Sequence, residues 1–400
     1  MILRLKFPIL KGLLIFEVAM RGMSVLGVVH HPSSLAEASR LALVPGDHVE
    51  FPADSLVYGT WTIDVGGEEG RPITIATAPG GKPATLSNPN FKDDFGRVLD
   101  IRASYVVVER LSFADGATPV PDRTADPNYL GEMHRLVPQM ATVHVEKGAT
   151  HVVVRNCEFT GCPIGIRLRG SDCVVVSNRL HGAGKITERW GAIAVAMTGS
   201  RLELAYNEIW DYGFFGGVAA ADGAAFEIDG EDPACARPVG DVNIHHNRAR
   251  NVKGGFIEVT RADVRNVRLA DNFSDCQDKF AGFWQLADGV TVTGNEIWHR
   301  REPLRDLFWG AVTNAVFAGN VVRFAEGTHF DRDEKGHRRR GYGLDFVRSN
   351  NHYISTARDA RDFFRGKPLA PGETYRREDA CSLRQAVGEI PKREINAWVR

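Results

Sequence analysis

The sequence is poor in the signals that mark several large classes of protein. It has six cysteines but no Cys-x-x-Cys pair, no zinc-ligand spacing and no HExxH motif, so no zinc site is predicted. No apolar run approaches the ~20 residues that a membrane-spanning helix needs. Lys and Arg number 49 against 50 Asp and Glu, so no strong field favours nucleic acid or an anionic membrane as a partner.

What the sequence does contain is a repeated phrase, a short β-branched run that ends in Asn, which recurs at steps of 22 to 40 residues. Self-similarity of this size indicates a solenoid, and the Val-rich alternation indicates strands rather than helix pairs. We therefore predict an all-β, right-handed parallel β-helix in which each Asn lies at the same bend of its coil and bonds to its neighbours above and below. The predicted ladder comprises Asn156, Asn178, Asn207, Asn247, Asn272, Asn295 and Asn320.

The stretch PGDHVEF…YGTWTIDVGGEEGRPITIATAPGGKPATL resembles the first coils of pectate-lyase-like β-helix proteins, including chondroitinase-B-type and alginate-type lyases. The resemblance implies the fold, which many activities share. Before it, Ser34 to Glu37 form a capping-box pattern that predicts a short helix through Leu43. We expect a β-helix over 31–356 with a Pro-rich loop at 117–141, followed by a polar, partly helical C-terminal cap at 357–400.

Residues 1–30 have two interpretations. Basic residues precede the apolar stretch 12–20, as in a signal peptide, and this predicts a secreted or periplasmic protein. However, Glu17 interrupts the stretch, and no small-x-small cleavage site after it is convincing. A start at Met20 or Met23 is an equal alternative.

The strand before each ladder strand carries the most informative polar residues. Aligned on their apolar pairs, these strands read IRL, IAV, FEI, IEV and WQL. Alternation predicts that the first and third residues face the core, which places Ile193 and Trp284 inside, and that the middle residue faces out. The predicted outward column is Arg167, Ala194, Glu227, Glu258 and Gln285, with Asp229 beside it.

In this column Glu227 and Glu258 are expected to be stacked about 4.8 Å apart, with Asp229 about 7 Å from Glu258 on the diagonal. Like charges opposite one another destabilise a sheet, so a fold that keeps them must hold a cation, share a proton or use the acids. Carboxylates about 5 Å apart suit a retaining glycosidase, in which one is the nucleophile and the other, with a raised pKa, is the acid/base. The alternative is that these are solvated surface acids.

The phrase FEIDG…DVNIHHN…NVKGGFIEV also resembles bacterial β-helix proteins related to glycoside hydrolases. This resemblance implies Glu227, Asp229 and Glu258 as candidate catalytic acids. Further residues are candidates for substrate binding because they are aromatic residues that follow ladder positions, or basic and polar residues near the column. This set is Arg167, Gln285, Lys253, His246, Trp210 and Trp298.

Three functions stay open, each with a polysaccharide or oligosaccharide as partner. The first is a retaining glycoside hydrolase that needs no cofactor. The second is a polysaccharide lyase in which Glu227, Asp229 and Glu258 bind Ca²⁺ while a basic residue abstracts the C5 proton of a uronate. The balanced charge of the chain argues against a lyase, because a groove that binds a polyanion should be basic. The third is a non-catalytic glycan-binding β-helix. The polymer, its linkage, endo or exo action, the disulfide state and assembly into homo-oligomers are left open.

Overall fold

The computed structural model describes residues 27–89, 95–114, 135–187, 189–216, 221–229, 239–260, 263–299, 306–331 and 344–378. Several sequence predictions lie outside these residues. They are the leader before residue 27, most of the loop predicted at 117–141, and the cap from residue 379 onward.

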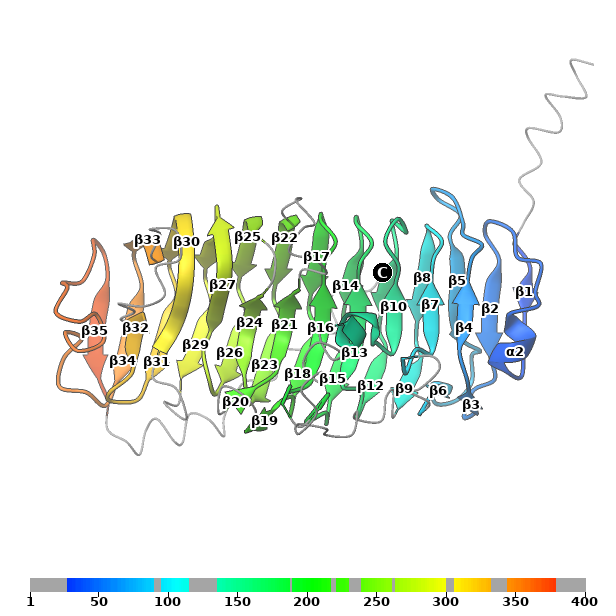
Figure 1. Ribbon diagram of the computed structural model, residues 1–400, viewed down its shortest axis with the longest axis horizontal. Helices are drawn as coiled ribbons and strands as arrows, with labels where there is room; N and C mark the ends of the chain where they lie inside the picture. Colours follow the sequence, from blue (N-terminus) through cyan, green and yellow to red (C-terminus); the bar gives the residue numbers. More distant parts are fainter. Residues whose placement is uncertain are drawn as a thin grey trace, which may run out of the picture.

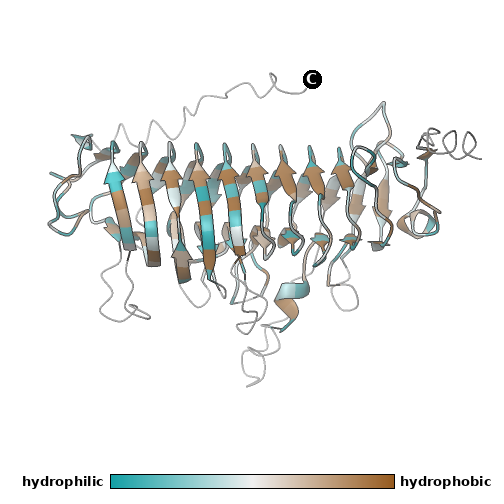
Figure 2. Ribbon diagram, turned by 90° about the horizontal axis from the view of Figure 1, so that it is seen from above, coloured by the Kyte–Doolittle hydropathy of each residue, from teal (hydrophilic) through white to brown (hydrophobic). Residues whose placement is uncertain are grey.

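The chain winds into a rod of stacked parallel strands, which confirms the predicted right-handed parallel β-helix (Figure 1). In most coils each of the three faces of the rod receives its own strand, whereas two longer strands near the C-terminal end continue from one face onto the next. Two of the faces belong to one 21-stranded sheet, and the third face is a 12-stranded sheet. Figure 2 shows the strands of successive coils side by side along the rod, with apolar and polar residues alternating within them.

The first face carries the predicted outward column. Its strands pair in parallel from coil to coil. They are β4 (Trp61–Ile63), β7 (Leu99–Ile101), β10 (Val143–Val145), β13 (Ile164–Leu168), β16 (Ile193–Met197), β21 (Ala224–Ile228), β24 (Gly255–Val259), β27 (Ala281–Asp288), β30 (Asp306–Ala318) and β32 (His329–Asp331).

The second face carries the strands that lead into the ladder. They are β1 (Val29–His30), β2 (His48–Phe51), β5 (Ile73–Thr77), β8 (Val106–Glu109), β11 (Val153–Arg155), β14 (Val174–Val176), β17 (Leu202–Ala205), β22 (Val239–His245), β25 (Val264–Ala270), β28 (Thr291–Thr293) and β33 (Leu344–Ser349).

The third face follows the ladder bend. Its strands are β3 (Leu56–Tyr58), β6 (Thr85–Ser87), β9 (Ser112–Ala114), β12 (Glu158–Thr160), β15 (Arg179–His181), β18 (Glu208–Trp210), β23 (Arg248–Val252), β26 (Phe273–Cys276), β29 (Glu296–His299), β31 (Val321–Phe324), β34 (His352–Ser355) and β35 (Thr374–Arg377). Because β35 pairs with β34, strand stacking continues beyond residue 356.

Three small elements depart from the coil pattern. The helix α2 (Leu35–Ala38) is shorter than predicted, and Ser34 caps it by accepting a hydrogen bond from the backbone N–H of Glu37. A short 3₁₀ helix, η1 (Val137–Gln139), lies in the segment before β10. An antiparallel pair, β19 (Phe214–Phe215) and β20 (Ala221–Asp222), leads into β21. No helix among the described residues is long and apolar enough to cross a membrane.

The Asn ladder runs along the bend between the second and third faces. The side-chain oxygen of Asn247, for example, accepts hydrogen bonds from both the backbone N–H and the side-chain amide of Asn207, each at 2.9 Å. The same paired contact is repeated in six successive steps. The ladder comprises Asn178, Asn207, Asn247, Asn272, Asn295, Asn320 and also Asn351, which sequence analysis missed.

The predicted place of Asn156 in the ladder is wrong. Asn156 is exposed with a positive φ of 53°, and the next residue, Cys157, occupies the ladder position and donates its backbone N–H to Asn178 Oδ1 at 3.0 Å. The residue before each ladder Asn also has positive φ, as at Ser177 and Tyr206. Because Asn itself tolerates this left-handed conformation, Asn156 satisfies the bend one residue early.

The interior of the rod is filled by aliphatic and aromatic side chains that stack from coil to coil. Phe113 lies on Phe159 with ring centroids 4.7 Å apart, and Phe256 lies on Phe280 at 5.0 Å. The described cysteines Cys157, Cys162, Cys173 and Cys276 are buried free thiols. Since every coil contributes its own layer to this core, the core grows along the rod rather than across it.

We predict that Asn247→Ala destabilises the protein strongly, because it leaves the backbone N–H of Asn207 and one hydrogen of its side-chain amide without an acceptor inside the rod. Each buried group left unsatisfied costs about 1–3 kcal/mol, so we expect a loss of about 2–5 kcal/mol in unfolding free energy. Asn156→Gly is the matched control, since its side chain is exposed and its φ suits Gly. Equal losses in chemical denaturation would contradict the ladder assignment.

Candidate functional site

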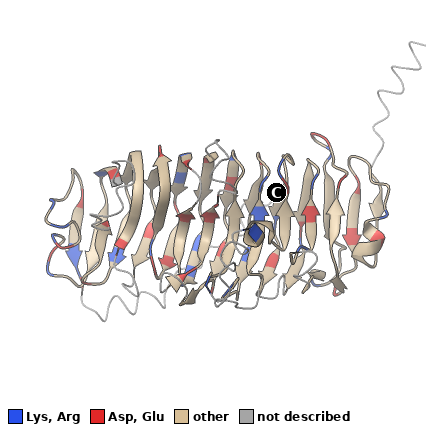
Figure 3. Cartoon of the chain, viewed as in Figure 1, with Lys and Arg blue, Asp and Glu red and all other residues tan. Residues whose placement is uncertain are grey.

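The predicted stacking of two carboxylates is present. The register between β21 and β24 places Glu227 directly opposite Glu258. The same outward column continues through Ala196 to Arg167 and His144, as the pairings of β16, β13 and β10 show. Acidic and basic positions therefore follow one another along the first face of the rod (Figure 3). Neighbouring strands lie about 4.8 Å apart, which sets the spacing of the two residues at the backbone.

Two members of the predicted column are wrong. Ala196, not Ala194, lies between Arg167 and Glu227. The strand IAVAM is apolar on both sides, so alternation does not fix its register. On the other side Gly282, not Gln285, lies opposite Glu258. Gln285 lies further along β27, where the pairing of β27 with β30 shifts in register after Phe283.

The same shift in register places Trp284, predicted to be inside, on the surface with 39% of its area exposed. Ile193 is also misplaced. It packs with Val137 and Ile186 in a second apolar cluster, separate from the core of the rod.

Glu227 and Asp229 meet at one hydroxyl group. Thr260 Oγ1 lies 3.1 Å from Glu227 Oε1 and 3.2 Å from Asp229 Oδ1. Burial raises the pKa of Glu227 well above its usual range, and the neighbouring carboxylates raise it further. Those carboxylates belong to Asp229, Glu258 and Asp222. Glu227 is therefore suited to hold a proton near neutral pH.

Arg167 is fully buried and lies beneath the segment that contains η1. Its Nε donates to the carbonyl of Met140 and its Nη2 to the carbonyl of Val137, both at 3.1 Å. Its Nη1 lies 3.5 Å from Asp229 Oδ2. Arg167 thus supplies a counter-charge to the acids from below. Its predicted role as a substrate ligand does not fit a guanidinium with 0% exposure.

Glu258 has a different set of partners from Glu227. Lys279 Nζ lies 2.7 Å from its Oε1, and Trp284 Nε1 donates to its Oε2 at 3.2 Å. Burial opposes the charged form of Lys279, but the nearby carboxylates of Glu258 and Asp278 outweigh this effect and hold the pKa of Lys279 above its usual range. Glu258 is therefore paired with a lasting positive charge.

On β27, Gly282 lies opposite Glu258. Because Gly has no side chain, the side chains of Trp309 and Lys279 can occupy the space beside it. A Cβ there would lie 2.3 Å from Trp309 Nε1 and 2.8 Å from Lys279 Cε. Lys279 lies over the Trp309 ring, with its Nζ 5.0 Å from the ring centroid, and Trp284 contacts Trp309 edge to face. These side chains border the acid pair on the C-terminal side.

Asp222 is a fourth acid, which sequence analysis missed. It ends β20 and accepts a hydrogen bond from the Gly223 backbone N–H at 2.9 Å. Burial and the charge of Glu258 raise the pKa of Asp222 to about 6. No strand alternation points to it, because it comes from the antiparallel β19–β20 pair and not from a coil.

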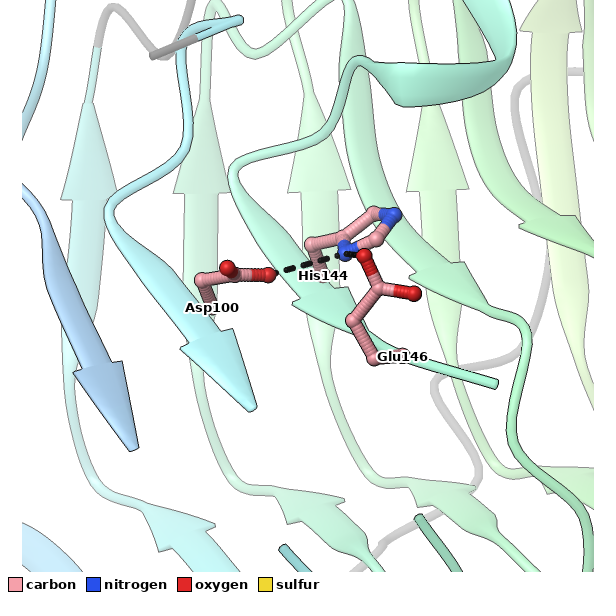
Figure 4. A group of neighbouring side chains, drawn as sticks. All are labelled: Asp100, His144 and Glu146. Carbon is pink, nitrogen blue, oxygen red and sulfur yellow. Dashed lines mark hydrogen bonds and ion pairs between the residues drawn. The ribbon is translucent and has the colours of Figure 1, made fainter. Parts of the chain in front are cut away.

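A second polar cluster lies further along the column. Asp100, His144 and Glu146 have potential ligand atoms within 4.8 Å of one another. Figure 4 shows both carboxyl groups near His144 Nδ1, which is 3.1 Å from Asp100 and 3.7 Å from Glu146. Burial lowers the pKa of His144 to about 4, and the hydrogen bond from His144 helps to lower the pKa of Asp100 to about 2, against the effect of burial.

The charges around this cluster do not fit a metal ion. Arg97 Nη1 lies 3.1 Å from Asp100 Oδ1 and 3.6 Å from Glu146 Oε1. Arg102 binds the other Asp100 oxygen at 2.8 Å, and Arg169 binds Glu146 at 2.8 Å. Three guanidinium groups are thus already paired with the two carboxylates. This pairing favours a charge network over a metal centre.

The remaining predicted substrate ligands do not gather at the acids. Trp210 stacks on His181 on the third face, and Trp298 donates to Glu296 there. His246 lies at the ladder bend. Lys253 lies beside the β19–β20 pair that carries Asp222, with its Nζ 5.3 Å from the ring centroid of Phe215.

We predict that Asp222→Asn stabilises the protein at pH 7 but not at pH 4. A carboxyl whose pKa rises from 3.8 to about 6 on folding binds its proton more tightly when folded, so its contribution to stability is lost as pH rises through this interval. The side chain of the Asp222→Asn variant does not ionise, so the variant does not lose this stability as pH rises. Denaturation midpoints at the two pH values measure the effect, and a gain of equal size at both would contradict it.

No family model and no curated protein matches the chain. Among solved structures, the tailspike protein of E. coli bacteriophage HK620, as a double mutant, has a TM-score of 0.54 at 11% identity over 82% of this chain and 58% of its own. XylC in complex with xylose has a TM-score of 0.51 at 10% identity, over 83% and 76%. An alginate lyase from Paenibacillus has 0.47 at 15% identity, over 82% and 93%. At such low identity, the tailspike and XylC comparisons establish the fold alone, a parallel β-helix.

Proposed function

We propose that this protein is a carbohydrate-active enzyme that cleaves glycosidic bonds of a polysaccharide or oligosaccharide as a retaining glycoside hydrolase. The observation that carries the proposal is the register of Glu227 opposite Glu258, combined with their unequal surroundings. Fold alone does not decide function. The XylC structure with xylose supports the proposal to the extent that a similar rod binds a sugar.

The two acids divide into an acid/base and a nucleophile. Glu227 has a pKa well above its usual range because it is buried among other carboxylates, so it retains its proton and can donate it to the leaving oxygen. Glu258 lies beside the Lys279 ammonium, which provides a counter-charge for an ionised nucleophile. Unequal surroundings of this kind are the usual basis for assigning different roles to two neighbouring carboxyl groups.

The spacing of the pair favours retention over inversion. Groups on adjacent strands are about 4.8 Å apart at the backbone, close to the roughly 5–5.5 Å between carboxyl groups in retaining enzymes and below the 6.5–9.5 Å that leaves room for a water in inverting ones. In the first step Glu258 attacks the anomeric carbon while Glu227 protonates the departing oxygen. In the second, Glu227 takes a proton from water, which displaces Glu258 and releases the sugar.

The aromatic residue best placed to meet a sugar is Trp284. It is 39% exposed while its indole N–H is held by Glu258, so one face is available beside the proposed nucleophile. The predicted platforms Trp210 and Trp298 lie on the third face instead. This placement gives less support to a glycan-binding module that relies on those two residues.

The calcium-dependent lyase remains the alternative. It needs a basic residue that can lose its proton, but the nearest amine, Lys279, has a raised pKa and stays protonated. It also needs a vacant acidic cluster, whereas Arg167 and Lys279 already approach the acids. Secretion and homo-oligomer formation stay predictions that neither mechanism requires.

We predict that Glu227→Gln and Glu258→Gln each lower turnover by about 10²–10⁴-fold, the usual contribution of such groups, without unfolding the protein. Glu203→Gln is the control, because Glu203 lies exposed on the second face with His245 as its partner. The assay is the release of new reducing ends from neutral and acidic polysaccharides. Full activity in both site variants would remove these residues from the reaction.

We also predict that chelation of Ca²⁺ leaves turnover unchanged and that the products lack the ultraviolet absorbance of an unsaturated uronate. Hydrolysis creates no double bond, whereas β-elimination does. Absorbance that disappears on chelation would establish the lyase and reassign Glu227, Asp229 and Glu258 as calcium ligands. Tight binding of a glycan with neither product would support the binding module.

A further inference from the structure

The hydroxyl group of Thr260 lies between two carboxyl groups, and its single proton cannot serve both. Thr260 follows β24, and its backbone N–H donates to the Ile228 carbonyl, which places it opposite Asp229. Its Oγ1 lies 3.1 Å from Glu227 Oε1 and 3.2 Å from Asp229 Oδ1. A hydroxyl has one donor hydrogen, so one of these contacts is attractive only if the carboxyl group supplies the hydrogen.

We propose that Glu227 and Asp229 share one proton through Thr260, with Glu227 donating to Thr260 Oγ1 and Thr260 donating to Asp229. This arrangement satisfies all three groups. Two ionised carboxylates would leave one oxygen facing the Thr260 oxygen without a hydrogen between them, which is costly at a partly buried site.

The neighbouring charges decide which carboxyl group holds the proton. Asp229 is 3% exposed and has Arg167 Nη1 at 3.5 Å, so a positive charge stabilises its ionised form. Glu227 is faced by Glu258 from β24, by Asp222 from β20 and by Asp229 from its own chain segment, all of which oppose its ionisation, while Arg167 acts in the other direction. The balance places the proton on Glu227.

Thr260 is therefore a positioning residue rather than a catalytic one. It orients the proton of Glu227 and links Glu227 to the carboxyl group of Asp229. This consequence for catalysis rests on the proposed hydrolase, in which Glu227 is the acid. The shared proton itself is a property of the resting protein and holds with or without turnover.

The test is a pH titration of the Glu227 side chain by NMR, in protein labelled with ¹³C at glutamate carboxyl groups and assigned with Glu227→Gln. We expect the wild-type signal to titrate well above the usual range of Glu. Thr260→Val removes both hydrogen bonds of the singly protonated state and should lower the midpoint by about one pH unit or more. Thr260→Ser keeps the hydroxyl and should preserve it.

Two further variants make the result decisive. Thr313→Val removes a similar Thr–carboxylate contact, to Asp288 at 2.9 Å on another coil, and should leave the Glu227 midpoint unchanged. Asp229→Asn removes the anion and should lower the midpoint; it also serves as the second probe if Thr260→Val does not fold. An ordinary Glu midpoint in the wild type, or an unchanged midpoint in Thr260→Val, would overturn the shared proton.

The outcome separates this inference from the proposed function. If Glu227→Gln abolishes hydrolysis but Thr260→Val leaves the titration unchanged, only the shared proton fails. If the titration follows expectation and no glycosidic bond is cleaved, the proton is shared at a site with another role. With a substrate in hand, Thr260→Val should also shift the alkaline limb of kcat/KM to lower pH, and Thr260→Ser should not.

Discussion

Stacking of successive coils in register is the interaction on which the rest of the structure depends. Backbone hydrogen bonds and the Asn ladder fix each coil on the next, so that a residue has a defined neighbour about 4.8 Å above and below it. Inside the rod this repetition gathers apolar side chains into layers. Outside, the same repetition forces polar side chains into columns, whether or not their charges are compatible. Glu227 and Glu258 are neighbours for this reason.

The protein offsets the resulting repulsion with cations from other coils, on either side of the two acids. Arg167, on β13, reaches Asp229, and Lys279, just before β27, reaches Glu258. Each cation is itself buried, and each is tied by a second contact, to backbone carbonyls for Arg167 and to Asp278 for Lys279. Buried charges of this kind are stable only when paired, so both acids and cations are held in fixed positions. A fixed site of this kind suits catalysis better than loose binding.

Much of this arrangement could be predicted from the sequence, because repetition makes local patterns readable. The strands FEI and IEV alternate between apolar and acidic residues, and this fixed Glu227 and Glu258 on the same side. The alternation fails where both faces are apolar, as at Ile193, or where a strand has an irregular register, as at Gln285. The prediction for Asn156 was wrong for a different reason. Asn fits both the ladder position and the position before it, where φ is positive, so residue type alone does not tell which of the two Asn156 occupies.

The parts that escaped prediction come from segments outside the repeat. The carbonyls that bury Arg167 belong to 137–140, and Asp222 belongs to the β19–β20 pair. No period relates these segments to the strands they contact, so sequence spacing cannot place them. Their effect is nevertheless chemical, because a covering segment removes water from the column and thereby strengthens every charge interaction beneath it. In this rod the repeat sets which side chains are neighbours, and the excursions set the environment in which those neighbours ionise.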